Sequence, residues 1–328
     1  MQNNSLISQK NVLVTGGAGF IGSNLIQSLL DAENTVVCLD NFSTGHQHNI
    51  TEFLTNSRFS LIEGDIRDFS TCTKACENID VIFHHAALGS VPRSIADPIS
   101  TTQVNIEGFV NILTAAKEAQ VQKVIYASSS STYGDADYSP KVETKKGNLL
   151  SPYAVSKQTN DLYAQVFSRT YGIKTIGLCY FNVFGPKQDP NGAYAAVIPK
   201  FINILRHHNQ PTIYGDGLQS RDFTYIDNVV HANLLAASSS LSNAHEHINI
   251  ACGESITLRD LTEHIIHTLG SYDSKISSIK PIFGEPRLGD IPHSLASIKK
   301  AQNLLQYSPL CTVREGIEKT ISWFIANR

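Results

Sequence analysis

A glycine-rich turn between a short strand and a helix is the feature that most restricts the fold of this chain. Residues 11–15 (NVLVT) form a β-branched run, and Gly16, Gly19 and Gly22 follow it with GxxGxxG spacing. Residues 23–30 (SNLIQSLL) then repeat leucine and isoleucine at helical spacing. Such glycines let a pyrophosphate approach the N–H groups at the helix N-terminus and let the helix pack closely on its strand. The pattern predicts a dinucleotide site, although similar glycines also occur in plain loops.

The second predicted strand ends in an acidic residue. Residues 35–40 (TVVCLD) end at Asp40, where a carboxylate can accept hydrogen bonds from the ribose hydroxyls of an adenosine. The same carboxylate would repel the 2′-phosphate of NADP, so it favours NAD. Taken alone, Asp40 could equally be a helix cap or turn residue. Next to the glycine turn, the cofactor role is the stronger interpretation.

Further strand-like runs alternate with helical stretches such as 104–119. The runs are 59–65 (FSLIEGD), 80–87 (DVIFHHAA), 123–130 (KVIYASSS) and 175–185 (TIGLCYFNVFG). This alternation predicts an α/β fold with a Rossmann-type, doubly wound parallel sheet. Ligands of such sheets bind beyond the carboxyl ends of the strands. The candidates at that edge are Asp65, Ala86, Ala87 and Ser128 to Ser131.

Composition restricts the possible partners. The chain has 26 basic and 29 acidic residues, a net charge of -3 and no dense basic run, which argues against nucleic acid. The first ten residues are polar and no stretch has the length of a membrane span, so we expect no membrane partner and a cytoplasmic location. The six cysteines lack CxxC spacing. We therefore expect reduced thiols and no metal site.

A tyrosine and a lysine form the candidate reactive pair. Tyr153 and Lys157 are four residues apart in a helical stretch and share one face. The ammonium of Lys157, together with a nicotinamide ring, would lower the pKa of Tyr153 and let it act as a base. A YxxxK pair alone is usually just a solvated helix face. Here a hydroxyl cluster around Ser129 precedes it at the same edge of the sheet, and the order of all these features is specific.

That order resembles a known family. The chain is similar to the extended short-chain dehydrogenases/reductases over essentially its whole length, and within them to UDP-hexose 4-epimerases, above all the bacterial UDP-N-acetylglucosamine 4-epimerases. The stretches that carry the resemblance are DNFSTGHQHN (40–49), EGDIRD (63–68), AALGSVPRS (86–94), SPYAVSK (151–157), YFNVFG (180–185), PNGAYAAVIPK (190–200), SRDFTYIDNV (220–229) and RLGD (287–290).

The resemblance implies a catalytic triad and two sets of binding residues. The triad is Ser129, Tyr153 and Lys157. The implied NAD-binding residues are Gly16, Gly19, Phe20, Ile21, Gly22, Asp40, Asn41, Ser43, Thr44, Gly45, Asp65, Ile66, Ala86, Ala87, Asn105, Tyr153, Lys157 and Tyr180. The implied UDP-sugar-binding residues are Gly89, Ser90, Ser129, Ser130, Asn182, Ala196, Val197, Tyr214, Arg221, Arg287, Asp290 and Ser294. Arg221 and Arg287 would clamp the diphosphate, because arginine suits bidentate phosphate contacts.

Two features of the sequence indicate which reaction of the family to expect. Relatives that dehydrate or decarboxylate nucleotide sugars carry an acidic residue at the strand end, whereas Ser130 and Ser131 occupy those positions here. An epimerase needs no such acid. In relatives that accept N-acetyl groups, the position four residues after the aspartate of RxGD is small, and here it is Ser294. The resemblance therefore implies interconversion of UDP-GlcNAc and UDP-GalNAc, with UDP-Glc and UDP-Gal as further substrates to be tested.

Alternatives stay open at this point. Cys179 and Lys187 stand where relatives usually have arginine. A UDP-N-acetylhexosaminuronic acid 4-epimerase is possible if Arg93 or Lys187 meets a carboxylate. Another dehydratase or decarboxylase of the family and a non-catalytic NAD-binding regulator are the remaining alternatives, although a regulator usually loses the tyrosine or the lysine.

The resemblance also predicts the domain organisation. Residues 1–180, with a returning segment at about 224–250, would form the NAD-binding domain, and residues 181–223 and 251–328 a smaller α/β domain that binds the UDP-sugar. Val229, Val230, Leu234 and Leu235 recur at helical spacing in the returning segment. We expect a homodimer from the resemblance alone.

Overall fold

A seven-stranded parallel sheet forms the largest part of the molecule. The computed structural model describes residues 6–191, 196–286 and 292–327. The strand order is β11-β6-β5-β4-β1-β2-β3, which confirms the predicted doubly wound sheet. Its strands are β1 (Asn11–Thr15), β2 (Thr35–Asp40), β3 (Phe59–Glu63), β4 (Val81–His84), β5 (Lys123–Ser129), β6 (Lys174–Tyr180) and β11 (His245–Ile250).

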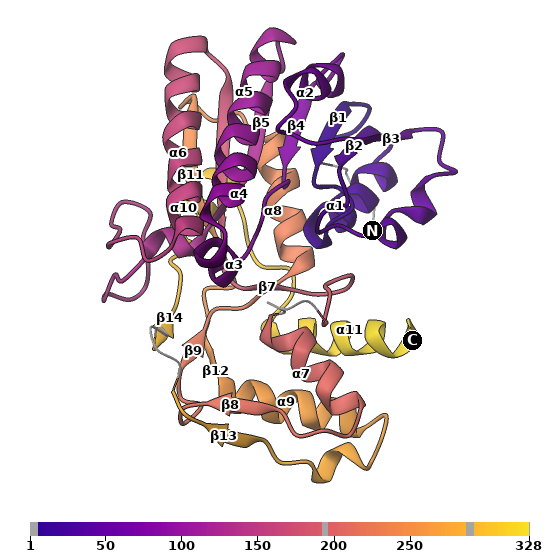
Figure 1. Ribbon diagram of the computed structural model, residues 1–328, viewed down its shortest axis with the longest axis vertical. Coiled ribbons are helices and arrows are strands. Elements are labelled where there is room, and N and C mark those ends of the chain that lie inside the picture. The colour runs from indigo at the N-terminus through magenta and orange to yellow at the C-terminus, as the bar shows by residue number, and fades with distance from the viewer. Residues whose placement is uncertain (1–5, 192–195, 287–291, 328) are drawn as a thin grey trace.

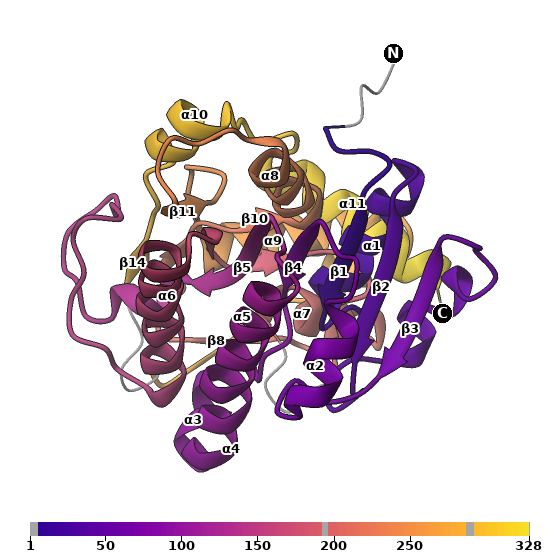
Figure 2. The same cartoon turned by 90° about the horizontal axis from the view of Figure 1, so that it is seen from above.

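Helices cover both faces of this sheet (Figures 1 and 2). One face carries α2 (Phe69–Ala75), α5 (Gly108–Glu118) and α6 (Pro152–Tyr171), and the other carries α1 (Phe20–Asp31) and α8 (Ile226–Ser238). The short helices α3 (Val91–Ala96) and α4 (Pro98–Thr102) lead through a π-helical turn at Gln103–Glu107 into α5. The helix predicted over 104–119 is therefore present, but its first turn is wider than an α-helical one.

The remaining elements form a smaller part below the carboxyl edge of the sheet (Figure 1). Its helices are α7 (Val197–Arg206), α9 (Leu258–Gly270) and α11 (Val313–Ala326), while α10 (Lys299–Leu305) contacts β11. Its short strands are β7 (Val183–Phe184) with β10 (Thr224–Tyr225), β8 (Thr212–Tyr214) with β13 (Ile282–Gly284), and β9 (Ser220–Arg221) with β12 (Ile256–Thr257) and β14 (His293–Ser294). The division into domains stays a prediction.

One predicted strand is two strands in the structure. The run 175–185 was expected to be continuous, yet β6 ends at Tyr180 and β7 belongs to a different sheet. Asn182 stands between them with a φ of 39° and donates its side-chain N–H to the carbonyl of Asp222 at 2.8 Å. Asparagine tolerates this left-handed backbone better than most residues. The turn redirects the chain from the large sheet to the smaller part.

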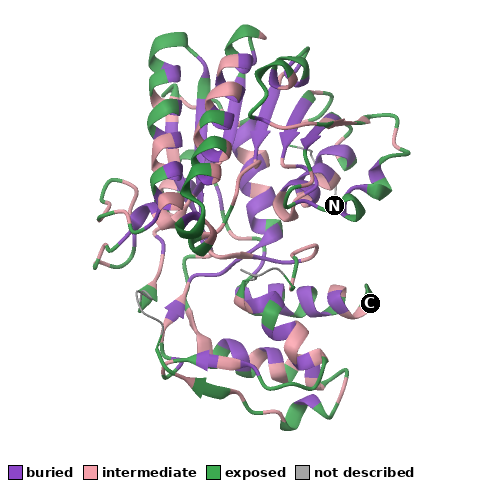
Figure 3. Cartoon of the chain, in the orientation of Figure 1, coloured by how far each residue is buried: buried purple, intermediate pink, exposed green. Residues whose placement is uncertain are grey.

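The hydrophobic core lies on both faces of the large sheet, where the central strands are buried (Figure 3). Strands β1 and β4 have almost no exposed residues, as expected of parallel strands covered by helices on both sides. The same packing leaves only the carboxyl edge of the sheet open toward the smaller part. Functional side chains are therefore to be sought at that edge.

Candidate functional site

The glycine turn has no room for larger residues. Gly16 has a φ of 69°, and a Cβ there would lie 2.6 Å from the backbone nitrogen of Ala86. A Cβ on Gly22 would lie 2.2 Å from the carbonyl oxygen of Gly16. Gly19 is the N-cap of α1, which begins at Phe20 and continues through Ile21. The turn thus brings the start of α1 against the end of β1 and exposes backbone N–H groups at the carboxyl edge.

A cavity beside this turn collects most of the predicted cofactor residues. Its lining includes Gly16, Gly19, Asp40, Asn41, Ser43, Thr44, Gly45, Asp65, Ile66, Ala86 and Ala87. It also includes Leu39, Gly64, His85, Leu88 and Val104, which were not predicted. Burial lowers the pKa of His85 to about 3, so this ring is neutral beside the cavity. Only its adjacency to Ala86 at the end of β4 could have pointed to it in the sequence.

Asp40 is held in place by the backbone around it. Its carboxylate accepts hydrogen bonds from the N–H groups of Ala18 and Phe42 at 2.9 and 2.8 Å. Burial raises its pKa, and these hydrogen bonds act in the opposite direction. A fixed carboxylate at the end of β2 and a glycine cradle at the end of β1 together suit an adenosine ribose and a pyrophosphate. The residues present therefore fit NAD.

The side chains of two predicted cofactor residues form hydrogen bonds with other parts of the protein. The side chain of Asn105 accepts the N–H of Leu88 at 2.8 Å and donates to Ser156 at 3.1 Å, which ties the loop after β4 to α6. The hydroxyl of Tyr180 exchanges hydrogen bonds with Asn233 of α8. Both side chains are buried. They position the loop and the strand end rather than presenting polar groups to the cavity.

The catalytic candidates meet where β5 ends and α6 begins. Ser151 caps α6 by accepting the N–H of Ala154 at 3.1 Å, and Pro152 occupies the first turn. This start fixes Tyr153 in the first turn and Lys157 one turn later. Lys157 donates to the carbonyl of Ala127 at 2.8 Å, and its Nζ lies 5.9 Å from the centre of the Tyr153 ring.

Ser129 completes the group. As the last residue of β5, it accepts hydrogen bonds from the backbone N–H and the hydroxyl of Ser131 at 3.2 and 3.0 Å. It also interacts with the Tyr153 hydroxyl, and this hydrogen bond lowers the pKa of the tyrosine. The structure thus brings the three predicted residues together, with Ser130 next to them in a short helical turn.

The pKa of Tyr153 differs from the expectation. Burial raises this pKa above its ordinary value, and it outweighs the effect of Ser129. Burial also lowers the pKa of Lys157 to about 8. The desolvation of both groups explains why the protein alone does not lower the pKa of the tyrosine. A positively charged cofactor bound beside Tyr153 would lower this pKa.

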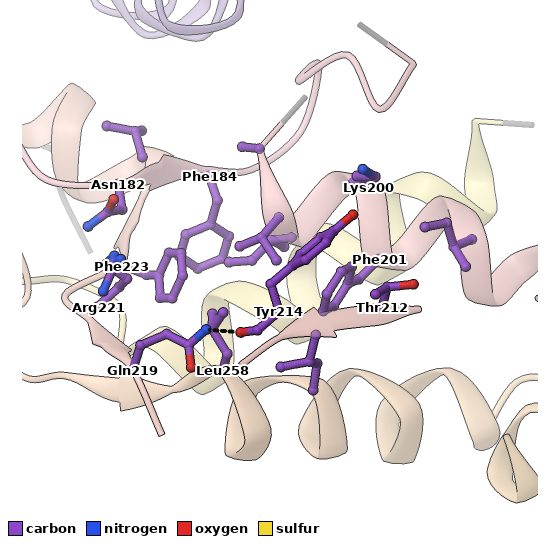
Figure 4. A pocket seen from close by; sticks show the side chains of 16 residues that line it. Asn182, Phe184, Lys200, Phe201, Thr212, Tyr214, Gln219, Arg221, Phe223 and Leu258 are labelled. Atoms are coloured by element: carbon purple, nitrogen blue, oxygen red, sulfur yellow. Dashed lines mark hydrogen bonds between the residues drawn. The ribbon is translucent and has the colours of Figure 1, made fainter. Parts of the chain in front are cut away.

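A second cavity, of about 340 Å³, lies in the smaller part (Figure 4). The predicted residues Asn182, Ala196, Val197, Tyr214 and Arg221 line it. The unpredicted lining includes Phe184, Lys200, Phe201, Thr212, Gln219, Phe223 and Leu258. Figure 4 shows aromatic rings between Asn182 and Lys200, with the Gln219 amide donating to the carbonyl of Tyr214 at 2.6 Å. An aromatic cavity with cationic groups at its border suits a base and a diphosphate.

Of the remaining predicted substrate residues, Gly89, Ser90 and Ser294 are not part of this cavity lining. Gly89 has no atom within 4 Å of a built Cβ, so it borders open space after β4. Ser90 caps α3 by accepting the N–H of Arg93 at 3.2 Å. Ser294 is half-buried in β14, directly beside Arg221 of β9. Arg287 and Asp290 lie outside the described residues.

The two departures from the family pattern have different surroundings. Lys187 donates to Glu52 at 2.8 Å and to the carbonyl of Asn49 at 3.0 Å. It is thereby held by the region after β2, and it does not line the cavity that contains Arg221. Cys179 is buried in β6 beside Ser128 of β5.

Other classes of site find no positive support in the described part of the chain. All six cysteines are free thiols. Within residues 6–191, 196–286 and 292–327, no three His, Cys, Asp or Glu side chains are grouped so that they could hold a metal ion. In the same ranges, no helix has both the length and the apolar character needed to cross a membrane.

Comparisons with known proteins agree with this geometry. The model of the NAD dependent epimerase/dehydratase family matches residues 12–251. A putative UDP-glucose 4-epimerase of Methanocaldococcus jannaschii is 35% identical over 96% of this chain and 99% of the relative. Among solved structures, the UDP-N-acetylglucosamine 4-epimerase of Methanobrevibacter ruminantium M1, in complex with UDP-N-acetylmuramic acid, has a TM-score of 0.91 at 40% identity, covering 98% of this chain and 100% of the other. The UDP-glucuronic acid 4-epimerase of Bacillus cereus, in complex with UDP-glucuronic acid and NAD, has a TM-score of 0.86 at 33% identity, covering 97% and 100%.

Proposed function

This chain belongs to the NAD-dependent epimerase/dehydratase family, and on that premise we propose that it interconverts UDP-GlcNAc and UDP-GalNAc through a 4-keto sugar. The observation that carries the proposal is the convergence of Ser129, Tyr153 and Lys157 at a strand end that bears hydroxyls instead of a carboxylate. This arrangement supports proton transfer at a sugar hydroxyl. It offers no acid for the elimination of water.

The cavity beside the glycine turn would hold the adenosine and pyrophosphate of NAD, with Asp40 at the ribose. When bound, the cofactor supplies a reversible acceptor for the hydride of the sugar C4. Tyr153 removes the proton of the 4-hydroxyl and later returns it, and Ser129 orients the reacting oxygen by a hydrogen bond. The Lys157 ammonium favours the phenolate form of Tyr153. Inversion then requires only that the oxidised sugar presents its other face to the same residues.

Nearby carboxylates support epimerisation rather than dehydration. Asp135 accepts hydrogen bonds from the backbone and side chain of Asn148 at 2.7 and 3.1 Å. Glu143 accepts the N–H of Asn249 at 2.9 Å. Asp135 and Glu143, two of the three carboxylates in the loop after β5, are thus engaged in holding that loop, so neither supplies the acid that Ser130 and Ser131 lack. The third, Asp137, is exposed.

The structure gives different degrees of support to the alternative functions. A UDP-hexosaminuronic acid would need a cation near the sugar, and Lys187 is instead held by Glu52. Arg93, at the start of α3, is the other candidate for a carboxylate. Because a solved relative binds UDP-glucuronic acid, the assay described below includes a uronic acid substrate. A non-catalytic regulator would be expected to lose Tyr153 or Lys157, and both are present.

One product assay separates these functions. The purified protein is incubated in turn with UDP-GlcNAc, UDP-GalNAc, UDP-Glc, UDP-Gal and a UDP-N-acetylhexosaminuronic acid, and the products are separated by anion-exchange chromatography. We expect both acetamido sugars to reach the same equilibrium mixture. Turnover of the uronic acid alone, loss of water from the product, or no turnover of any sugar would each contradict the proposal.

The size of residue 294 tests the choice of sugar. A tyrosine in Ser294→Tyr would fill the volume that an acetyl group needs, so we expect turnover of UDP-GlcNAc to fall by at least about tenfold, while any turnover of UDP-Glc persists. The matched control Ser294→Ala keeps the position small and should retain the acetamido activity. Unchanged UDP-GlcNAc turnover in Ser294→Tyr would show that this residue does not limit the pocket.

A further inference from the structure

A buried group of charged and polar side chains lies between α6 and the large sheet. Asp161 follows Lys157 by one helical turn on α6 and is buried. Its carboxylate accepts the hydroxyls of Tyr126 and Ser128 at 3.0 and 3.2 Å, both from β5. These two neutral donors satisfy hydrogen bonds but leave the negative charge uncompensated. A buried carboxylate in this position requires a cation.

The adjacent strands do not provide that cation. Position 179 of β6 pairs with Ser128 on one side and with Asn249 on the other, and it holds a buried cysteine. Asp161 raises the pKa of the Cys179 thiol further, after burial, so this thiol is neutral. His247 of β11 lies 3.3 Å from Asp161. Burial lowers the pKa of its ring to about 4, which makes it neutral too at ordinary pH.

A lysine from the loop between β5 and α6 approaches Asp161 instead. The Nζ of Lys146 lies 3.4 Å from the Asp161 carboxylate and 2.7 Å from the side-chain oxygen of Gln158, one turn earlier on α6. The lysine side chain is 22% exposed and the aspartate side chain 7%. The pair is therefore shielded from water, and its attraction is stronger than that of a surface pair.

The charge of Asp161 also affects the position of Lys157. This lysine has to keep its ammonium between the Ala127 carbonyl and the Tyr153 ring, while Asp161, one turn below it, attracts the same ammonium. An uncompensated Asp161 would draw Lys157 down the helix and away from the tyrosine. It would also add negative potential that disfavours the Tyr153 phenolate.

We propose that Lys146 is a positioning residue that neutralises Asp161 from the loop between β5 and α6 and so keeps Lys157 at Tyr153. Its effect on catalysis rests on the proposed function. Its effect on the charge balance does not. Residue 179 of β6 pairs with Ser128, which contacts Asp161, and its thiol supplies no cation. The cation comes from the loop instead.

The first experiment measures kcat, KM and the pH profile of Lys146→Met in the NAD-loaded enzyme. Lys145→Met is the matched control, because Lys145 is exposed on the same loop and lies over the Tyr138 ring. We expect kcat of Lys146→Met to fall about tenfold with little change in KM, and the acidic limb of the profile to move about half a pH unit upward, because the phenolate is harder to form. Lys146→Arg should retain the wild-type profile. A wild-type kcat and profile in Lys146→Met would overturn the proposal.

The second experiment moves the positive charge from residue 146 of the loop to residue 179 of β6. We expect Cys179→Arg to restore the rate and the pH profile of Lys146→Met, because the new cation faces the same carboxylate from β6. A role of Lys146 in loop packing alone would not be rescued from another strand. If the double variant folds, as judged by circular dichroism, and shows no rescue, the proposal is wrong.

A third measurement needs no substrate. Urea unfolding midpoints are compared for Lys146→Met, Asp161→Asn and the double variant. If the two residues compensate each other, Asp161→Asn will suppress most of the loss caused by Lys146→Met, whereas additive losses would overturn the proposal. Suppression without turnover of any UDP-sugar would disprove the proposed function and leave the charge compensation intact.

Discussion

Tyr153 is the residue on which the chemistry depends, and its surroundings explain why it needs help. Burial in the first turn of α6 opposes the phenolate, and the interaction with Ser129 favours it. The Lys157 ammonium is a nearby positive charge, with its Nζ 5.9 Å from the centre of the Tyr153 ring. Each acts over a short distance that the strand end of β5 fixes. A change in any of the three should therefore affect the rate more than the binding of nucleotide.

Replacement of Tyr153 by phenylalanine tests the base directly. Loss of a general acid–base group typically costs about 10²–10⁴ in rate, so we expect kcat of Tyr153→Phe to fall by that factor. The ring is retained, so the folded structure and the NAD content should not change. Product formation by chromatography and nucleotide release on denaturation measure the two quantities. Epimerisation at the original rate would refute the assigned role.

The pH dependence at alkaline pH follows from Lys157. Its pKa of about 8 lies below the ordinary lysine value because burial disfavours the ammonium. The ammonium is present below that pH and is lost as the pH rises through it, so kcat should decline above about pH 8. Lys157→Arg stays charged, and any activity that it retains should lack this decline. A wild-type kcat that stays flat from roughly pH 7 to 10 would show that the charge of Lys157 is not required.

At the scale of single residues, the sequence predicted which polar side chains belong to the candidate site better than it predicted the contacts of these side chains. Ser129, Tyr153 and Lys157 were recognisable because their spacing belongs to a strand end and one helix face. His85 lines a cavity because it directly follows β4, and Gln219 because it directly precedes β9. In the sequence, only the adjacency of His85 to Ala86 could have indicated this. Asn105 was predicted to bind the cofactor, and its contacts with Leu88 and Ser156 depend on packing between α6 and the loop after β4.

At the scale of elements, the glycine turn couples fold and cofactor. Gly22→Ala would force a methyl group against the Gly16 carbonyl, where the built Cβ lies 2.2 Å away. The helix must then move from its strand, so we expect the NAD content to fall at least severalfold and stability to drop by about 1–3 kcal/mol. Released nucleotide and urea unfolding measure the two effects.

Gly172→Ala is the matched control for that prediction. Gly172 ends α6 with a φ of 76° and has open space around its built Cβ. Alanine there should lower stability by about 1 kcal/mol through backbone strain alone and leave the NAD content unchanged. An equal loss of NAD in both variants would mean that the close packing at Gly22 has no special importance.

The order of strands and helices in the large sheet was predictable because each run has a clear period and turn residues at its ends. The break between β6 and β7 was not, because Phe181, Val183 and Phe184 continue the apolar pattern of the strand. The left-handed conformation of Asn182 depends on its contact with Asp222, forty residues away in the sequence. A local pattern does not contain that information.

At the scale of the whole molecule, each of the two cavities is formed by segments that are distant in the chain. The cavity beside the glycine turn combines the ends of β1, β2, β3 and β4, which the parallel topology predicts. The second cavity combines β7, α7, β8 and the start of α9. These elements are short, and their pairing is not periodic in the sequence. Only the family resemblance could have assigned Tyr214 and Arg221 to one site.

An apolar stripe on the surface of the described residues bears on the expected homodimer. Val155, Leu162 and Val166 lie on one side of α6 and are 46%, 56% and 52% exposed. The neighbouring helices α3 and α4, which contact α6, add Ile95 and Ile99 at 62% and 71%. An apolar stripe along a helix can pair with its own copy about a twofold axis, and such exposed patches mark interaction sites. We propose a second copy of this chain as its partner.

Charge in this stripe should therefore separate the subunits. Leu162→Glu combined with Val166→Glu would bury two carboxylates on each side of the twofold interface, where their desolvation is not repaid. We expect light scattering after gel filtration to give twice the chain mass of 35.9 kDa for the wild type and the single mass for the double variant. Leu310→Glu, at a leucine that is 61% exposed outside the stripe, should stay dimeric. The stripe faces away from Tyr153, so the monomer should still bind NAD; a wild-type monomer, or a double variant of unchanged mass, would rule out this interface.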